Sequence, residues 1–160
     1  MKLTTKGRYA VTALVDIAIN GAQNPITISE LSNRQSISQT YLEQLTGVLR
    51  AKGILVSVKG PGGGYLLAKS PDQITLADIL TAVNEPVDST RCSGQHNCQQ
   101  GKICLTHTLW EELNQIMLNF LQNKTLGELA RSEAIRQVAT RQVFQPIELI
   151  IGEPCETNLS

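Results

Sequence analysis

The first fifty residues repeat hydrophobic side chains every three or four positions, which is the spacing of helices that bury one face. This pattern predicts a first helix from Thr4 to Asn20. A second helix, over residues 28–34, opens with a T-x-x-E capping box, and a third begins after Ser38 and ends at Gly53. Because only three residues join the second and third helices, we predict a helix-turn-helix.

The pattern then changes from helical to extended. Residues 54–58 and 65–68 are strand-like, and the segment between them, KGPGGG, is rich in glycine. Two such runs around a glycine-rich tip predict a β-hairpin. A hairpin that directly follows a helix-turn-helix is the wing of a winged helix.

Helical spacing returns in the second half of the chain. A capping box at Thr75 predicts a short helix through about Val83, and a further short helix is expected over Thr125–Ala139. Between them lies the longest apolar stripe, which comprises Leu105, Leu109, Leu113, Ile116 and Phe120. An apolar helix face is stable only when it is buried. We therefore expect this one to pair with a second subunit in a homodimer; the alternative is packing against the chain's own core.

The predicted fold class is mainly α with a small β-hairpin, a winged helix-turn-helix followed by a long dimerisation helix. We expect residues 1–70 to form the DNA-binding region, with the helix-turn-helix over about 28–51 and the wing over about 54–68. Residues 71–131 would form the dimerisation helices and a ligand-binding loop, as one cooperative unit with the first region, and residues 132–160 a C-terminal tail.

Charge is divided between the two halves, although the net charge of the 160 residues is zero. Residues 1–70 carry eight lysines and arginines against three acidic residues, a net charge of +5, and residues 71–160 carry −5. A basic front half is typical of phosphate binding and predicts double-stranded DNA as a partner. The chain lacks a signal-peptide pattern and any apolar run of the ~18 residues that span a membrane, so we expect a cytoplasmic protein without a membrane partner.

Polar side chains are expected to face DNA from the third helix and the wing. Glutamine can bond adenine, glutamate can accept from a cytosine amine, and wing glycines allow the backbone close to a phosphate. The candidates are Ser38, Gln39, Thr40, Tyr41, Glu43, Gln44, Arg50, Lys59 and Gly60. The alternative for the helix is a solvated face, and that for the glycine tip, a nucleotide phosphate loop, lacks the required G-x-x-x-x-G-K-[ST] motif.

Three cysteines and a histidine lie in or just after the polar segment 86–103, which should be mobile without a ligand. Their spacing is Cys92-x5-Cys98-x5-Cys104-x2-His107, with Cys104 and His107 expected on one face at a helix start. Thiolates suit iron-sulfur clusters or zinc, but zinc knuckles are usually tighter, and thiol redox chemistry is the third alternative. His96 is a competing imidazole that we expect to be solvated, and Cys155 is expected to be a free thiol.

These segments resemble the iron-sulfur cluster regulators of bacteria, a family of winged-helix transcription regulators. The resemblance rests on LTTKGRYAVTALVDIA, ISQTYLEQL, VKGPGGGYLL, VDSTRCSGQHNCQQGKICLTHTLW and TLGEL, and covers about residues 1–131. It implies a homodimer with one 2Fe-2S cluster per subunit, held by Cys92, Cys98, Cys104 and His107 and supplied by the cluster-assembly machinery. The wing residue is commonly arginine in this family, and here it is Lys59, which lacks the planar guanidinium.

The resemblance also implies repression of the genes for cluster assembly, activation at other promoters, and a role for Glu43 in discriminating operator types. Two alternatives remain: a DNA-binding thiol or nitric oxide sensor, and an electron or cluster carrier. No nucleophile–base pair or paired-carboxylate arrangement stands out in the sequence, so we do not expect an enzyme.

Overall fold

The computed structural model describes residues 3–90 and 92–144, and its N-terminal half is the predicted three-helix unit. Helix α1 spans Thr5–Asn20, α2 spans Ile28–Gln35 and α3 spans Gln39–Ala51. The predicted caps are in place: Thr27 and Glu30 form a reciprocal capping box, and the Ser38 side chain accepts from the Tyr41 N–H. Ser36, in the turn between α2 and α3, has a left-handed φ of 54°.

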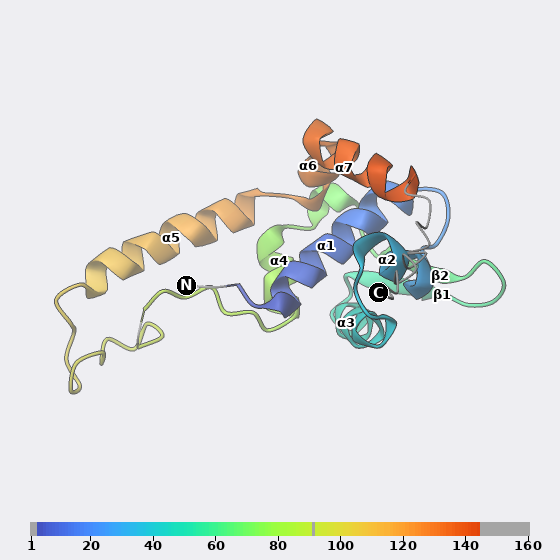
Figure 1. The fold of residues 1–160 in the computed structure, drawn as a ribbon. Helices are drawn as coiled ribbons and strands as arrows, with labels where there is room; N and C mark the ends of the chain where they lie inside the picture. Colours follow the sequence, from blue (N-terminus) through green and yellow to red (C-terminus); the bar gives the residue numbers. More distant parts are fainter. Residues whose placement is uncertain (1–2, 91, 145–160) are drawn as a thin grey trace, which may run out of the picture.

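The wing is a two-stranded antiparallel hairpin, as the sequence predicts. Strand β1, Leu55–Val58, pairs with β2, Gly64–Leu67, with Leu55 opposite Leu67. A side chain at Gly63 would place its Cβ 2.3 Å from the Val58 carbonyl oxygen, so the tip needs glycine there. In Figure 1 the hairpin projects beyond the helices.

The elements that follow the wing pack against the N-terminal helices. A 3-10 turn, η1 at Pro71–Gln73, precedes α4, Leu76–Ala82, and later α6, Leu126–Arg131, packs against α1 and η1. Leu126 is fully buried, and its N–H donates to the Ile74 carbonyl at 2.8 Å.

The prediction of a single helix over Thr125–Ala139 is wrong, because the chain forms two helices there. Helix α6 ends at Ser132, whose ψ of 124° is extended, and α7 spans Glu133–Phe144. Residues 133–144 of the expected C-terminal tail are therefore helical. The proposed division into regions stays a prediction.

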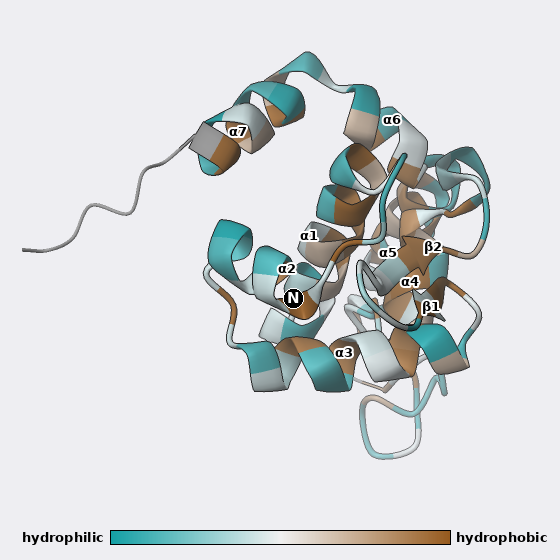
Figure 2. Ribbon diagram, turned by 90° about the vertical axis from the view of Figure 1, so that its right-hand side faces the viewer, coloured by the Kyte–Doolittle hydropathy of each residue, from teal (hydrophilic) through white to brown (hydrophobic). Residues whose placement is uncertain are grey.

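The longest helix, α5 at His107–Asn123, extends away from the other elements (Figure 1). Most of its predicted stripe is exposed: Leu109 at 57%, Ile116 at 66% and Phe120 at 60%. Leu105 precedes the helix and is fully exposed, so the stripe begins one turn later than predicted. In Figure 2 hydrophobic residues gather in the interior between α1, α3 and α4, where the core lies. Among the described residues, no helix is long and apolar enough to cross a membrane.

Candidate metal centre and DNA-reading surface

The cysteine-bearing loop joins α4 to α5 and is anchored to the middle of α5. The Asp88 carboxylate accepts from the Asn114 amide at 2.7 Å and from the backbone and side chain of Thr90, each at 2.7 Å. The Asn114 carbonyl in turn accepts from the Ser89 N–H at 2.7 Å. These bonds fix the entry of the loop four residues before Cys92, whereas the expected mobility of the loop stays a prediction.

His107, the first residue of α5, lies between two of the cysteines. Its Nδ1 is 3.6 Å from the Cys92 Sγ and 3.6 Å from the Cys98 Sγ. One donor atom from each of these three residues lies within 4.8 Å of the others. His107 is only 3% exposed, and its Nε2 is buried without a hydrogen-bond partner among the described residues. Because both sulfurs face Nδ1, that nitrogen rather than Nε2 is the one placed to join the cysteines as a ligand.

The sequence predicts Cys104 on one helix face with His107. In the structure Cys104 instead lies beside the three grouped donors, before the helix begins. It precedes α5, and its N–H donates to the Cys98 Sγ at 3.1 Å. Its own sulfur is 3.9 Å from the Thr106 hydroxyl. Its thiol contacts Cys98 but is not among the donor atoms that lie within 4.8 Å of one another.

His96 is exposed, as expected, but it is not remote from the site. Its ring centroid lies 4.5 Å from that of His107, and donor atoms of His96, His107 and Glu111 also lie within 4.8 Å of one another. Of the two imidazoles, His107 is the better candidate ligand because it is buried and faces the sulfurs.

The three thiols differ in acidity. Burial alone raises the pKa of Cys92, but the backbone N–H groups of His96 and Asn97 outweigh it and leave that pKa below its ordinary value. The pKa of Cys104 is lowered, first by its contact with Cys98. The Cys104 N–H lowers the pKa of Cys98, but burial and the neighbouring thiols raise it above its usual range. A lowered pKa eases the loss of the thiol proton that metal binding requires, so Cys92 and Cys104 suit a soft metal or an iron-sulfur cluster.

The donor set fits an iron-sulfur cluster. Three free cysteines and one imidazole offer four ligands, and all four residues lie outside the hydrophobic core. Cys155, predicted to be a free thiol, lies outside the described residues.

The candidate DNA-reading side chains form an exposed surface on α3. Six of them are exposed: Ser38, Gln39, Thr40, Glu43, Gln44 and Arg50. Tyr41 is half-buried and packs edge-on against Tyr9 of α1, with ring centroids 5.7 Å apart.

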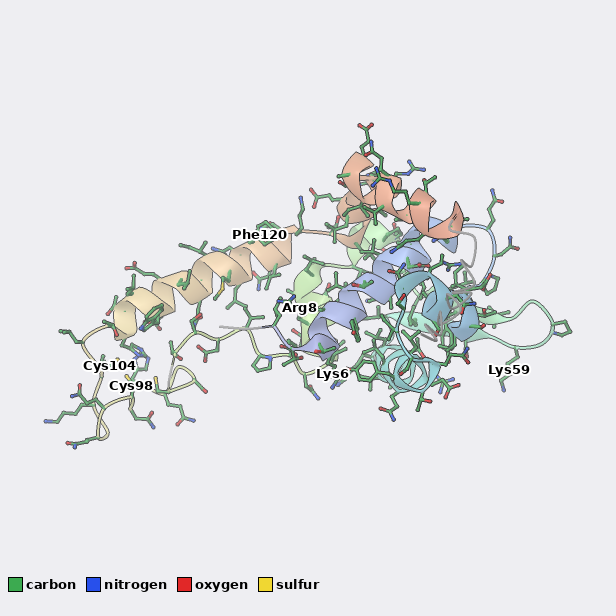
Figure 3. All side chains as sticks on the ribbon, viewed as in Figure 1. Lys6, Arg8, Lys59, Cys98, Cys104 and Phe120 are labelled. Carbon is green, nitrogen blue, oxygen red and sulfur yellow. The ribbon has the colours of Figure 1, made fainter. Side chains whose placement is uncertain are left out.

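The wing and α1 add cations to this surface. Lys59 and Gly60 are exposed at the hairpin tip, where Gly60 has a φ of +92° that favours glycine. Figure 3 shows Lys59 on the wing and Lys6 near the start of α1. Within residues 3–90 and 92–144, neither lysine forms an ion pair.

Two polar networks around this surface were not predicted from the sequence. Asp16, on α1, is buried and forms an ion pair with Arg34 at 2.7 Å. Glu85, also buried, accepts from the N–H and hydroxyl of Thr4. The first network had a visible signal, since Asp16 is an acidic residue within an apolar helix, but the second had none.

Comparison with known proteins places this arrangement among bacterial regulators. A family model described as "Rrf2: Iron-dependent Transcriptional regulator" matches residues 3–132. The HTH-type transcriptional regulators IscR of Yersinia pestis and Serratia proteamaculans are each 48% identical to the chain over 157 residues, covering 98% of this chain and 96% of theirs.

Solved structures agree with that placement. CymR (YrzC), the global cysteine regulator of B. subtilis, superposes with a TM-score of 0.72 at 29% identity, covering 81% of this chain and 96% of that one. T. potens IscR superposes with a TM-score of 0.65 at 28% identity, over 91% of this chain and 93% of that one. The predicted mainly helical winged-helix fold is confirmed.

Proposed function

The chain belongs to the Rrf2 family of transcriptional regulators, and from that premise we propose that it senses an iron-sulfur cluster and reads DNA accordingly. It is a transcriptional regulator rather than an enzyme. The proposed cluster is of the 2Fe-2S type, received from the cluster-assembly machinery, and its ligands are Cys92, Cys98, Cys104 and His107. The observation that carries the proposal is the buried His107, whose Nδ1 lies 3.6 Å from the sulfurs of both Cys92 and Cys98.

Different parts of the protein have different roles in this function. Cys92, Cys98, Cys104 and His107 would hold the cluster, which would supply a redox-active iron centre beside α5. Asp88 and Asn114 hold the loop entry against α5, so that the cysteines stay near His107. The polar side chains of α3 read operator bases, and Lys59 and Gly60 contact the backbone or minor groove from the wing. At promoters for cluster assembly the expected outcome is repression, with activation at others.

Anaerobic purification tests this function. Iron and acid-labile sulfide should each approach two atoms per protomer, with visible absorption and with binding of duplex operators that differs between loaded and cluster-free protein. Colourless protein whose DNA binding responds only to thiol oxidants would instead indicate a thiol sensor, which the three adjacent cysteines could also support. Coloured protein that binds no duplex DNA in either state would favour a carrier.

We further propose that two subunits pair through α5. The exposed stripe of α5 borders a groove of about 500 Å³ that includes Ile116, Met117, Phe120 and Leu121. This face is continuous and apolar, and a second copy would present the same face to it, as a twofold dimer requires. Pairing would also set the distance between the two reading helices.

Replacing Leu113 or Ile116 by Ala should therefore weaken the dimer. Losing one such side chain from an interface should raise the dimer dissociation constant by about tenfold or more, equal to about 1.4 kcal/mol. Sedimentation equilibrium measures this directly, and Gln115→Ala, on an exposed position of the same helix, is the matched control. An unchanged dimer dissociation constant in both Leu113→Ala and Ile116→Ala would place the interface elsewhere.

Glu43 should act as a specificity residue. A carboxylate at a base edge is favourable only beside a donor such as the cytosine amine, and a wrongly placed one costs about 1–3 kcal/mol. Glu43→Ala should then raise the affinity of cluster-free protein for operators otherwise reserved for the loaded form, by roughly 5- to 150-fold. Glu43→Gln separates charge from shape. Equal loss at both operator types, measured by fluorescence anisotropy, would make Glu43 an ordinary contact.

A further inference from the structure

We propose that Glu85 is a positioning residue that couples the cysteine-bearing loop to the recognition helix α3 through the first turns of α1. The inference rests on the proposed function and adds a route by which a ligand in the loop changes how α3 meets DNA. Allosteric coupling needs such a physical element that both sites can bias.

The first link joins the loop to α1. Glu85 lies between α4 and the loop, and its carboxylate accepts from the Thr4 N–H at 2.7 Å and from the Thr4 hydroxyl. Thr4 is the N-cap of α1, and its hydroxyl also accepts from the Gly7 N–H. Glu85 is 7% exposed, so solvent does little to replace these bonds. The bonds to Thr4 hold the pKa of the Glu85 carboxyl below its ordinary value, which keeps it an acceptor.

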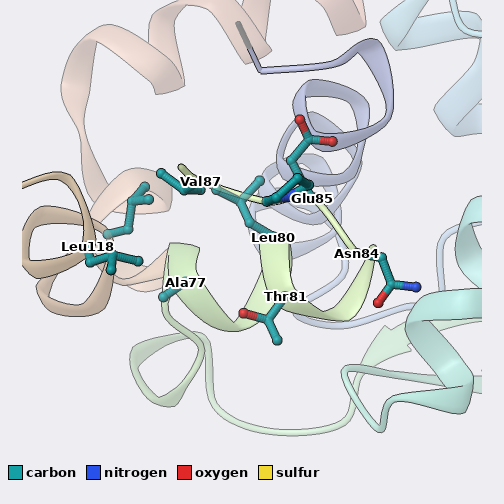
Figure 4. Close-up of a pocket in the computed structure, with 9 residues that line it drawn as sticks. Ala77, Leu80, Thr81, Asn84, Glu85, Val87 and Leu118 are labelled. Carbon is teal, nitrogen blue, oxygen red and sulfur yellow. The ribbon is translucent and has the colours of Figure 1, made fainter. Parts of the chain in front are cut away.

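The contact between Glu85 and α1 is close. A Cβ at Gly7 would lie 3.0 Å from the Glu85 Cγ and 3.2 Å from the Leu80 Cδ2. Gly7 is buried, so the first turn of α1 rests directly on the Glu85 side chain. Figure 4 shows this side chain turned toward α1. A shift of Glu85 must therefore move the start of α1 or break the bonds to Thr4.

The second link joins α1 to the reading end of α3. Tyr9, two residues after Gly7 in α1, packs edge-on against Tyr41 with an interplanar angle of 85°. Tyr41 is in the first turn of α3, and its N–H donates to the Ser38 hydroxyl at 3.3 Å. Glu43 follows two residues later. The contact thus reaches the part of α3 that carries most of the candidate base-reading side chains.

The segment between α4 and Asp88, residues 84–87, borders open space. A groove of about 500 Å³ lies beside it between α4 and α5, lined in part by Leu80, Pro86, Val87 and Leu118 (Figure 4). Asn84, directly before Glu85, has a left-handed φ of 53°. A well-packed segment resists displacement, whereas one beside open space can occupy a second arrangement. A ligand that draws Cys92, Cys98 and Cys104 together would shift the Asp88–Asn114 anchor, and with it the segment that begins at Glu85.

The test compares two glutamates whose carboxylates each accept from the backbone N–H of a helix N-cap threonine, Glu85 across the fold and Glu128 within its own helix. Glu85→Ala removes the proposed link. Glu128→Ala removes the carboxylate that accepts from the Thr125 N–H at 3.0 Å, away from the route to α3. The measured quantity is the ratio of operator affinities between cluster-loaded and cluster-free protein. We expect Glu85→Ala to reduce that ratio by about tenfold, with iron content unchanged, and Glu128→Ala to retain it.

Amide hydrogen exchange of the wild-type protein provides a second measurement that does not depend on any variant folding. Loading the cluster should change exchange at Thr4–Tyr9 as well as in the loop. A ratio that survives in Glu85→Ala, or exchange at Thr4–Tyr9 that is the same in both states, overturns the coupling while leaving the proposed function intact. A wild-type protein without cluster, or with equal affinities in both states, overturns the proposed function and the coupling with it.

Discussion

Replacing Cys92, Cys98 or Cys104 by Ala is expected to abolish cluster binding without unfolding the protein. Each removes one of four ligands, and the loop that carries them lies outside the hydrophobic core, which draws on α1 to α4, β1 and α6. Iron and sulfide per protomer, with visible absorption after anaerobic purification, give the result. We expect both to fall to background in each variant, while circular dichroism stays that of the parent.

Two further substitutions serve as controls for the ligand assignment. Cys155→Ala should keep the full cluster, since it changes the cysteine count but not the proposed ligands. His107→Cys should also bind a cluster, at a lower reduction potential, because replacing imidazole by thiolate generally lowers the potential. A full spectrum in Cys104→Ala would remove Cys104 from the ligands, and His96 would then be the next candidate because its ring contacts His107.

Local signals in the sequence predicted most of the helices and the wing. Thr27 with Glu30 and Thr75 with Asp78 form the reciprocal capping boxes expected of them, because a capping box depends only on residues three apart. The break at Ser132 was missed because the apolar spacing continues across it. A third capping box, Thr125 with Glu128, opens α6, but it gives no indication of where that helix ends.

The candidate site was predictable only as far as the ligand types and their spacing. Spacing grouped four residues, and the structure brings three of them, Cys92, Cys98 and His107, within 4.8 Å but not the fourth, Cys104. It could not indicate the side-chain direction of Cys104 or the pairing of Glu85 with Thr4, which are 81 residues apart. Long-range polar pairs leave no periodic trace, because each partner is an unremarkable surface residue type until the chain has folded.

The ion pair between Asp16 and Arg34 is the other point where a single change should have a large effect. The Asp16 side chain is 1% exposed, and it also accepts from the Gln35 amide at 2.6 Å and the Asn20 amide at 3.2 Å. The carboxylate raises the pKa of Arg34 through its hydrogen bonds. Arg34 and Gln35 end α2, so this network holds the helix-turn-helix against α1. Gln35 also bonds Gln142 of α7 at 3.0 Å.

Arg34→Ala should therefore destabilise the protein by about 3 kcal/mol, since it leaves a buried carboxylate without its cation. Thermal unfolding should shift down by roughly 6–12 °C for a chain of this size. The matched control is Arg131→Ala, which breaks the exposed Asp72–Arg131 pair and should leave the midpoint nearly unchanged.

The double variant Asp16→Leu with Arg34→Met separates stability from orientation. Removing both charges at once should restore most of the unfolding free energy, because apolar side chains of similar size avoid the desolvation of a buried pair. DNA affinity should remain at least about tenfold below the parent, because the directional bonds that fix the end of α2, and with it the start of α3, are gone. If the double variant recovered DNA affinity together with stability, packing alone would position the reading helix, and the ion pair would have no part in DNA recognition.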